Sequence, residues 1–458
     1  EEPYDKEHDI TANIIIIDGN KTDTDKPGTI RERGNASRSF PKKPWRLKFD
    51  KKQSVLGSPA KAKKWTLINN YGDKTLMRNL LAFEIARRLE MPFVAWARPV
   101  DVILNGEYKG CYQLCDQMEV NPGRVDITEM ETTDTESEAL SGGYFIEVDA
   151  YAYDEPEGEY FISQRGIPVT IKSPKDGGTP EQYNYIRNYF NRVEELVFEY
   201  RFGQDGGEDY RDIFDVESFV KHLIVGELSG NTDTYWSTYM YKDRNDQVLH
   251  TGPVWDFDIA FDNDNRTYPI HNTAGDFLYR FGQSSAANGM RDFADRIIID
   301  DKRTADDISR IWSRARNEHN LSAESMMAYA DRLARELDAS QQLNFMRWPI
   351  MNEWVHQNPQ LWGSYAAEVN NVKSYLTQRF DDLDKLMRYD PEYSGVTLPA
   401  SPLSGIVLRR GCITCGGDFE VYTPDGRLVF SGYGSTPALQ RGIYIVRSGK
   451  ATAKVAVR

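Results

Sequence analysis

The chain has 458 residues, 40% hydrophobic and 28% charged, which is typical of a globular protein with two or three domains. Its net charge of −14 and isoelectric point near 5.1 argue against general binding to nucleic acid or to an anionic membrane surface, because both would repel it. No run approaches the roughly 18 apolar residues of a membrane span. The sequence begins at Glu1 without an initiator Met or a signal peptide, so we expect a trimmed form of a longer chain.

Residues 10–49 predict strands, because apolar and polar residues alternate between short turns. The predicted strands are 14–17, 29–33 and 45–49, with a turn at 18–20 after the first.

A basic stretch covers the last two of these strands. From 31 to 52 there are nine Lys or Arg residues against two acidic ones. The turn between the strands reads Arg33-Gly34-Asn35-Ala36-Ser37. We interpret it as a phosphate cradle, in which backbone N–H groups of the turn act together with Lys43 or Lys48. The alternative is a solvated strand pair with no ligand.

The following segment mixes a helix with more strands. A helix is expected from an N-cap at Asp73 to a stop at Pro92, because apolar residues recur at helical spacing between them. Strands 98–104 and 109–114 are joined by Asn105-Gly106, a strong hairpin signal. Further strands are expected at 143–149 and 168–172, and an acid-rich loop at 129–140.

Beyond Pro180 the pattern becomes helical. Amphipathic helices are predicted over 183–197 and 219–228, and largely helical regions over 293–337 and 354–387. We therefore predict an α+β fold, with a β-rich part at 1–175 and a helical part at 176–392. A third piece, 400–458, contains short strands and turns typical of a small β-sandwich.

An acidic stretch lies where the two larger parts meet. Residues 230–265 contain seven Asp and no Glu. Rigidly held Asp oxygens suit Mg²⁺, which demands near-octahedral oxygen ligands. Asp233, Asp256 and Asp258 are the candidate set. If 252–261 is extended, Asp256 and Asp258 share one face. The alternative for any single Asp is a turn former or helix cap.

Cysteine adds little to the functional prediction. Cys111 and Cys115 form one pair, and Cys412 and Cys415 form another in a different predicted domain. Local disulfides or buried thiols are favoured over a shared zinc site, because no nearby His supports the metal.

Several motifs in order resemble those of the spore-coat protein H (CotH) kinase family, over about residues 10 to 390. The motifs are Arg33-Gly34-Asn35-Ala36-Ser37, Lys42-Lys43-Pro44-Trp45-Arg46-Leu47-Lys48-Phe49, Met77-Arg78-Asn79, the segments 105–112 and 142–149, Asn231-Thr232-Asp233 and Val254-Trp255-Asp256-Phe257-Asp258. The C-terminal piece resembles the sorting or surface-attachment domains of secreted Bacteroidetes-type proteins.

The resemblance implies an atypical protein-kinase-like fold that binds ATP and Mg²⁺. Its partner would be a Ser- or Thr-containing secreted or surface protein, which it would phosphorylate. Asp233 matches the catalytic Asp of the family and Asp256 its metal Asp, with Asp258 in the same motif. Lys43 or Lys48 matches the phosphate-binding lysine. Secretion or a cell-surface location is expected on the same ground.

Two positions depart from the family pattern. Ser237 or Thr238, weaker metal ligands, stand where an Asn is usual, and Cys115-Asp116 stands where Glu is common. A kinase-fold surface protein without catalysis, serving as a structural or binding module, is therefore the alternative function. A glycoside hydrolase that uses an Asp pair is a weaker one. An EF-hand is excluded, since Ile259-Ala260 follows where a third ligand and a Gly are required.

Overall fold

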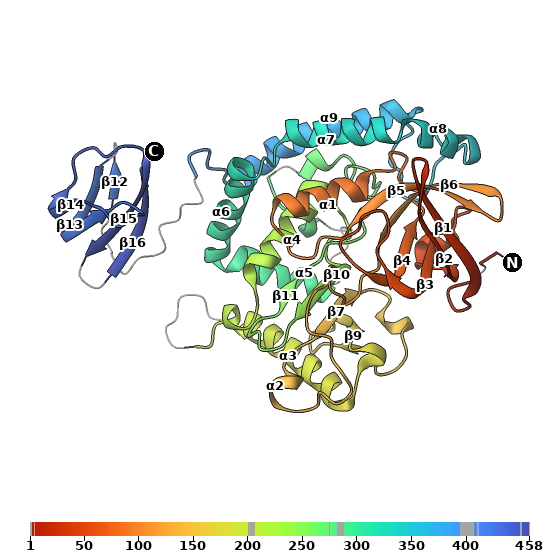
Figure 1. Ribbon diagram of the computed structural model, residues 1–458, viewed down its shortest axis with the longest axis horizontal. Helices are drawn as coiled ribbons and strands as arrows, with labels where there is room; N and C mark the ends of the chain where they lie inside the picture. Colours follow the sequence, from red (N-terminus) through yellow and green to blue (C-terminus); the bar gives the residue numbers. More distant parts are fainter. Residues whose placement is uncertain are drawn as a thin grey trace. The chain divides into compact units, whose positions relative to one another are not determined.

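The computed structural model describes residues 2–3, 5–199, 207–273, 275–281, 288–393, 407–409, 412–448 and 451–457. The chain divides into two compact units, Glu1–Asp390 and Pro391–Arg458. The larger unit is a mixed α/β structure with two antiparallel sheets, and the smaller unit is all β (Figure 1). Within the described residues, no helix has both the length and the apolar character needed to cross a membrane.

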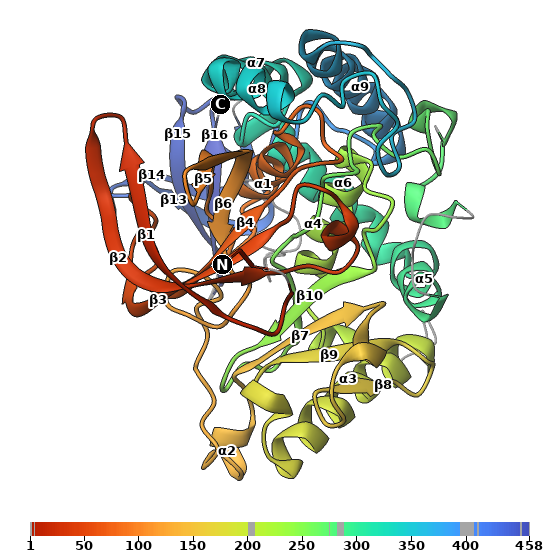
Figure 2. The same ribbon diagram turned by 90° about the vertical axis from the view of Figure 1, so that its right-hand side faces the viewer.

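The first sheet has six antiparallel strands in the order β1-β2-β3-β4-β6-β5. Figure 2 shows β1 and β2 as a long twisted ribbon. The hairpin predicted at Asn105-Gly106 is confirmed, with φ of 51° and 83° at the two residues. The strands are β1 (Ile10–Asp18), β2 (Lys21–Glu32), β3 (Trp45–Gln53), β4 (Ala62–Ile68), β5 (Ala97–Leu104) and β6 (Glu107–Asp116).

The two faces of this sheet differ in character. Trp45, Leu47 and Phe49 of β3 point to one face and are buried in a hydrophobic core. Because successive residues alternate, Arg46 and Lys48 point to the other face. The alternation that predicted these strands therefore separates a packed face from a polar one.

The second sheet draws on both halves of the chain. Its order is β11-β10-β7-β9-β8, and β10 pairs with β7. The predicted division at 175/176 does not separate the strands from the helices, because β10 and β11 come from the later part. The strands are β7 (Tyr144–Asp149), β8 (Tyr160–Ile162), β9 (Pro168–Ser173), β10 (Ser237–Lys242) and β11 (His250–Thr251).

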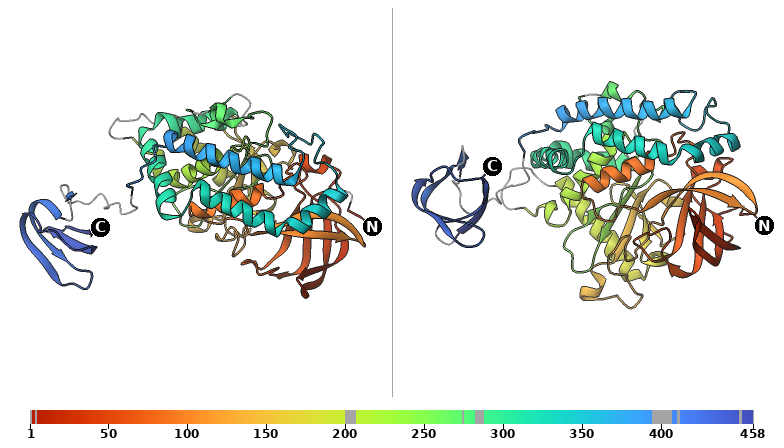
Figure 3. Two further views of the ribbon diagram at one scale, coloured as in Figure 1. Left: turned by 90° about the horizontal axis from the view of Figure 1, so that it is seen from above. Right: turned by 45° about the horizontal axis from the view of Figure 1, so that its top comes forward.

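Helices cover both sheets. The predicted helix at 183–197 is α3 (Pro180–Glu199), whose Phe190 packs on Phe161 of β8. The predicted helix at 219–228 is α4 (Val216–Ser229), which packs against α1 and α9. Figure 3 shows α7 and α9 running side by side. The remaining helices are α1 (Arg78–Arg88), α2 (Ser137–Leu140), α5 (Asn288–Asp295), α6 (Lys302–Glu318), α7 (Ala323–Glu336), α8 (Asp338–Arg347) and α9 (Tyr365–Leu386).

Two helix starts differ from the sequence prediction, and one short helix was not predicted. The first helix starts at Arg78 rather than beside Asp73, because Leu76 has a φ of 61° and interrupts the helical backbone. The acid-rich loop includes the single turn α2. The last long helix begins at Tyr365, since 354–364 adopts an irregular conformation that Asn358 fixes through a hydrogen bond to the Gly72 carbonyl.

The smaller unit is one sheet rather than the predicted sandwich. β13 pairs with β12, β14 and β15, so all five strands belong to one hydrogen-bonded sheet. Ile413, Phe419 and Val446 form its small core. Residues 405–406 of one predicted strand lie outside the described residues. The strands are β12 (Val407–Arg409), β13 (Cys412–Tyr422), β14 (Leu428–Ser435), β15 (Gly442–Ser448) and β16 (Ala451–Val457).

Cys111 and Cys115 are free thiols. Cys111 and Cys115 are buried on β6, where burial raises the pKa of each thiol to about 12. A Cys111–Cys115 disulfide is therefore absent, and the alternative of buried thiols is confirmed for this pair. The Cys415 side chain lies outside the described residues, so a disulfide between Cys412 and Cys415 stays a prediction.

Candidate functional site

Asp233 lies in the turn that follows α4. The helix ends at Gly230, whose φ of 64° is the left-handed conformation that terminates helices. Asn231 then makes two bonds: its Oδ1 accepts the N–H of Asp233 at 3.0 Å, and its Nδ2 donates to the carbonyl of Asp256 at 3.2 Å. One side chain therefore fixes the Asp233 turn against the segment that carries Asp256.

The segment around Asp256 is not a strand, so the expectation of an extended 252–261 is wrong. Asp256 has a φ of 71°, a conformation that Asp tolerates better than most residues. The N–H of Phe257 donates to Asn79 Oδ1 at 2.8 Å, and Nδ2 of Asn263 donates to the carbonyl of Asp258 at 2.9 Å. Side-chain amides, rather than a strand partner, hold this backbone.

Arg78 anchors the same loop to α1. Its Nε donates to the carbonyl of Ala260 at 3.0 Å, and its guanidinium pairs with Asp73. Both side chains are almost completely buried. Asp73 also accepts the backbone N–H of Thr75 at 2.9 Å. The pair therefore joins the start of α1 to the loop that ends the acidic segment.

The carboxylates of the site repel one another. Desolvation by the surrounding protein atoms and then repulsion from Asp233 raise the pKa of Asp256 to about 6, and Arg33 opposes both effects. The pKa of Asp258 is raised well above its ordinary value, first by burial and then by Asp256, Asp73 and Asp233. The Asp256 side chain remains open to solvent even so. The structure thus brings Asp233, Asp256 and Asp258 together with a surplus of negative charge.

Arg33 is the cation that acts on Asp256. Its guanidinium lies over the ring of Trp255, 6.0 Å from the centroid, and the other neighbour of that ring is Phe83, stacked at 6.1 Å. The turn after Arg33 is closed, because a Cβ at Gly34 (φ 84°) would lie 2.4 Å from Ser37 Oγ. The Arg33–Ser37 turn, with Asn35 exposed, therefore lies beside residues 252–265, the acidic loop, which carries Asp256 and Asp258.

The two candidate lysines point elsewhere. Lys43 Nζ donates to the carbonyl of Arg38 at 2.6 Å and so holds the short 3-10 turn Ala36–Ser39. Lys48 Nζ lies 3.9 Å from a carboxylate oxygen of Asp9 on the polar face of the first sheet.

The two candidates for the second metal ligand lie at the start of β10. Ser237 is its first residue and pairs with Asp149 of β7. Thr238 is buried, and its hydroxyl donates to the carbonyl of Thr234 at 2.9 Å. Thr238 is completely buried and Ser237 is partly exposed, so Ser237 is the better-placed candidate.

The site fits a divalent cation bound mainly through two carboxylates. The pKa values of Asp256 and Asp258 are raised first by desolvation and then by neighbouring carboxylates, and Arg33 offsets the charge of Asp256 only in part. In the part of the chain that the structure describes, no group of three His, Cys, Asp or Glu side chains forms a ready-made metal site. Mg²⁺ accepts such a site, since it is often held by one or two carboxylates together with substrate phosphates and water.

Sequence reasoning missed the residues that hold the site. Asn79, Asn231 and Asn263 are interior amides, whose roles depend on partners up to 178 positions away. It also missed the Glu147–Lys172 pair, 3.0 Å apart, in which burial raises the pKa of Glu147 to about 7. The available signals were the family motifs Met77-Arg78-Asn79, Asn231-Thr232-Asp233 and 142–149, which contain Asn79, Asn231 and Glu147.

Comparison with protein-family models matches residues 30–383 to the family described as CotH kinase protein. The matched region contains the whole acidic loop and the Arg33–Ser37 turn, and it ends before the C-terminal sheet. No curated protein matches the chain.

Proposed function

The chain belongs to the CotH kinase protein family, and from this premise we propose that it transfers the γ-phosphoryl group of ATP to Ser or Thr side chains of proteins in the presence of Mg²⁺. The match to the family model over residues 30–383 confirms the family resemblance that the sequence motifs indicated. A kinase-like arrangement of the larger unit, and secreted or surface proteins as substrates, are parts of the proposal. The C-terminal sheet lies outside the matched residues, so a sorting role for it rests on its sequence pattern alone.

The observation that supports the proposal most is the group of three Asp carboxylates with Arg33 beside it. Asp233, Asp256 and Asp258 lie close enough for repulsion to raise pKa values, and Arg33 opposes that repulsion. Phosphoryl transfer needs carboxylates for metal and proton together with cationic groups for phosphate. The site contains both on backbone that interior side chains hold in place.

Each residue can be given a role in the reaction. Asp256 and Asp258 would hold Mg²⁺, which neutralises phosphate charge when bound. Arg33 would face the phosphates. Asp233 would accept the proton of the acceptor hydroxyl. A bond forms between the acceptor oxygen and the γ-phosphorus, and the bond from that phosphorus to the β,γ-bridging oxygen breaks, leaving its electron pair on ADP.

Replacing Asp256 by Asn should weaken Mg²⁺-dependent ATP binding, because only the Asp258 carboxylate would then remain for the metal. Asn tolerates the left-handed backbone at this position but lacks the charge that a metal requires. In the wild type, Mg²⁺-dependent affinity should rise as pH increases through about 6, because the metal competes with the proton on Asp256. Calorimetric ATP titrations at several pH values, with and without Mg²⁺, measure both effects. An Asn variant that keeps the Mg²⁺-dependent affinity of the wild type contradicts the assignment.

Replacing Arg33 by Met should weaken ATP binding, whereas Lys48→Met should not. A charge-assisted contact to phosphate contributes roughly 1.5 to 3 kcal/mol, which is about ten- to a hundred-fold in affinity. Lys48 is the matched control, because it belongs to the same basic stretch but faces Asp9. ATP affinity of both variants is measured by calorimetry. A larger loss in Lys48→Met would place the phosphates on the polar face of the first sheet instead.

One observation favours the alternative of a binding module without catalysis. Thr238 is completely buried, so the weak ligand Ser237 is the better-placed residue where the family usually has Asn. ATP titration distinguishes the two functions. A wild-type chain that shows no Mg²⁺-dependent ATP binding would support the non-catalytic surface protein.

A further inference from the structure

Arg266 contacts Asp233, and the buried carboxylate of Asp264 holds its guanidinium rigidly. Its Nε lies 3.0 Å from each carboxylate oxygen of Asp264, and its Nη2 lies 2.7 Å from Asp264 Oδ2. The same Nη2 donates to Asp233 Oδ2 at 3.1 Å. The Asp264 side chain is completely buried, whereas those of Arg266 and Asp233 are 23% and 31% exposed. The guanidinium is therefore fixed from the interior and presented to Asp233 at the surface of the site.

The loop that carries Arg266 is itself tied down. The N–H of Asn265 donates to the carbonyl of Gln357 at 2.8 Å, and the N–H of Tyr268 donates to the carbonyl of Asp264 at 2.9 Å. His356 lies close enough for Asp264, Arg266 and Asp233 all to act on its pKa, which burial lowers. Backbone hydrogen bonds therefore hold the loop from which the Arg266 guanidinium reaches Asp233.

The contact leaves one oxygen of Asp233 available. Arg266 engages Oδ2, and the backbone N–H of Asp233 is engaged by Asn231. No other residue in the described ranges donates to Oδ1. Without Arg266, the side-chain torsion angle of Asp233 would be free, and its carboxylate would be repelled by that of Asp256.

We propose that Arg266, anchored by Asp264, is a positioning residue that holds the Asp233 carboxylate with Oδ1 directed to the acceptor hydroxyl. This inference rests on the proposed phosphoryl transfer, in which Oδ1 takes the proton as the acceptor oxygen bonds to phosphorus. A group that takes a proton must lie within hydrogen-bond reach of it, so a freely rotating carboxylate would be a poorer base.

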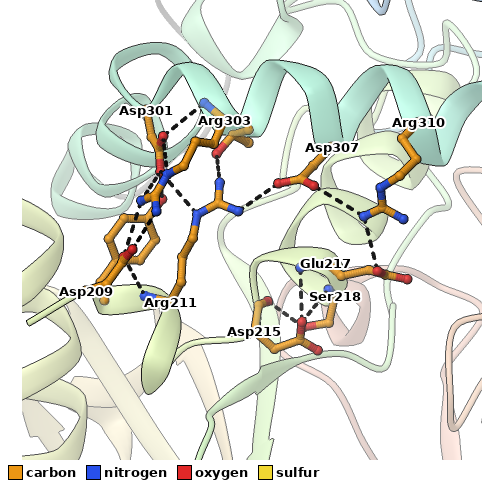
Figure 4. Close-up of polar contacts among 11 residues, drawn as sticks. Asp209, Arg211, Asp215, Glu217, Ser218, Asp301, Arg303, Asp307 and Arg310 are labelled. Carbon is orange, nitrogen blue, oxygen red and sulfur yellow. Dashed lines mark hydrogen bonds and ion pairs between the residues drawn. The ribbon is translucent and has the colours of Figure 1, made fainter. Parts of the chain in front are cut away.

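The chain offers a matched control in Arg303. Its Nε lies 3.0 and 3.1 Å from the oxygens of Asp301, its Nη2 lies 2.8 Å from Asp301 Oδ2, and its guanidinium also reaches Asp209 (Figure 4). Asp301 is also buried and also precedes its arginine by two positions. The two arrangements share the same Asp-x-Arg geometry, but Arg303 lies at the start of α6, and its contacts within the described residues are to Asp301 and Asp209 rather than to Asp233, Asp256 or Asp258.

The test compares Arg266→Lys with Arg303→Lys. A lysine retains the charge but cannot hold two carboxylates in the planar fork of arginine. Turnover in Arg266→Lys should fall by roughly a hundredfold, the size expected from a misplaced catalytic group, while KM for ATP stays within about twofold. In the Asp233→Asn background the same change should cost less than about threefold, because the group that it positions is already gone. Arg303→Lys should leave turnover unchanged.

A second measurement does not depend on activity. In protein labelled with ¹³C-aspartate, the carboxyl signal that Asp233→Asn removes should shift in Arg266→Lys and stay in place in Arg303→Lys. An unmoved signal overturns the contact. A shifted signal with an equal loss of turnover in the two backgrounds overturns the positioning role. If the signal shifts in Arg266→Lys but the wild type transfers no phosphate, the proposed function is refuted and the contact stands. A higher turnover in Arg266→Lys than in the wild type would identify Arg266 as an inhibitory residue and overturn the inference.

Discussion

Replacing Asp233 by Asn is expected to lower the turnover of phosphoryl transfer by roughly two or more orders of magnitude and to leave ATP affinity within about twofold. Asn cannot accept the proton of the acceptor hydroxyl, a function needed only in the transition state. Its amide can still accept the bond from Arg266, so the local structure should persist. ATP affinity is spared because Asp256 and Asp258, rather than Asp233, are assigned to the metal.

The measurement is single-turnover transfer from ATP to a Ser-containing protein, beside calorimetric ATP titration. Asp243→Asn is the control from the same Asp-rich stretch. The Asp243 carboxylate accepts hydrogen bonds from the backbone N–H groups of Thr128 and Arg244, and it is not one of the three carboxylates of the site. Turnover should be unchanged in the control. If Asp233→Asn weakens ATP binding as strongly as Asp256→Asn does, Asp233 is a metal ligand and its assignment as proton acceptor is wrong.

Replacing Arg78 by Met is expected to destabilise the larger unit by about 3 to 5 kcal/mol. The change leaves the buried Asp73 carboxylate without its cation and removes the bond from Nε to the Ala260 carbonyl. The loop that carries Asp256 loses an anchor at the same time. ATP affinity should therefore fall even under conditions where the variant remains folded.

Urea denaturation followed by tryptophan fluorescence measures the loss of stability. Arg332→Met is the matched control, because Arg332 makes an exposed pair with Glu336 at 3.9 Å and a cation–π contact with the Tyr329 ring at 4.6 Å, and each of these contacts contributes about 0 to 1 kcal/mol at an exposed site. The double variant Asp73→Asn with Arg78→Met should recover part of the loss, since it removes the unpaired charge. A loss equal to that in Arg332→Met would contradict the role of the buried pair.

Local patterns in the sequence determined much of the secondary structure. The alternation at 45–49 predicted both the strand and its buried face, because side chains along a strand point alternately to opposite sides. Asn105-Gly106 predicted its hairpin because both residues accept a positive φ. The order of the motifs identified the family, and the Asp-rich stretch identified the loop that carries the candidate site.

Only the tertiary structure decided which side chains share the site. Arg33, Lys43 and Lys48 are equivalent cations in the sequence, yet Arg33 alone among them acts on Asp256, because the turn that carries it lies against Trp255. The turn at Asp256 could not be read from its alternating neighbours, since Asn79 and Asn231 from distant elements hold its backbone. Periodicity reports the face on which a residue lies. Which elements meet at that face depends on packing between segments far apart in the chain, and no local pattern encodes that packing.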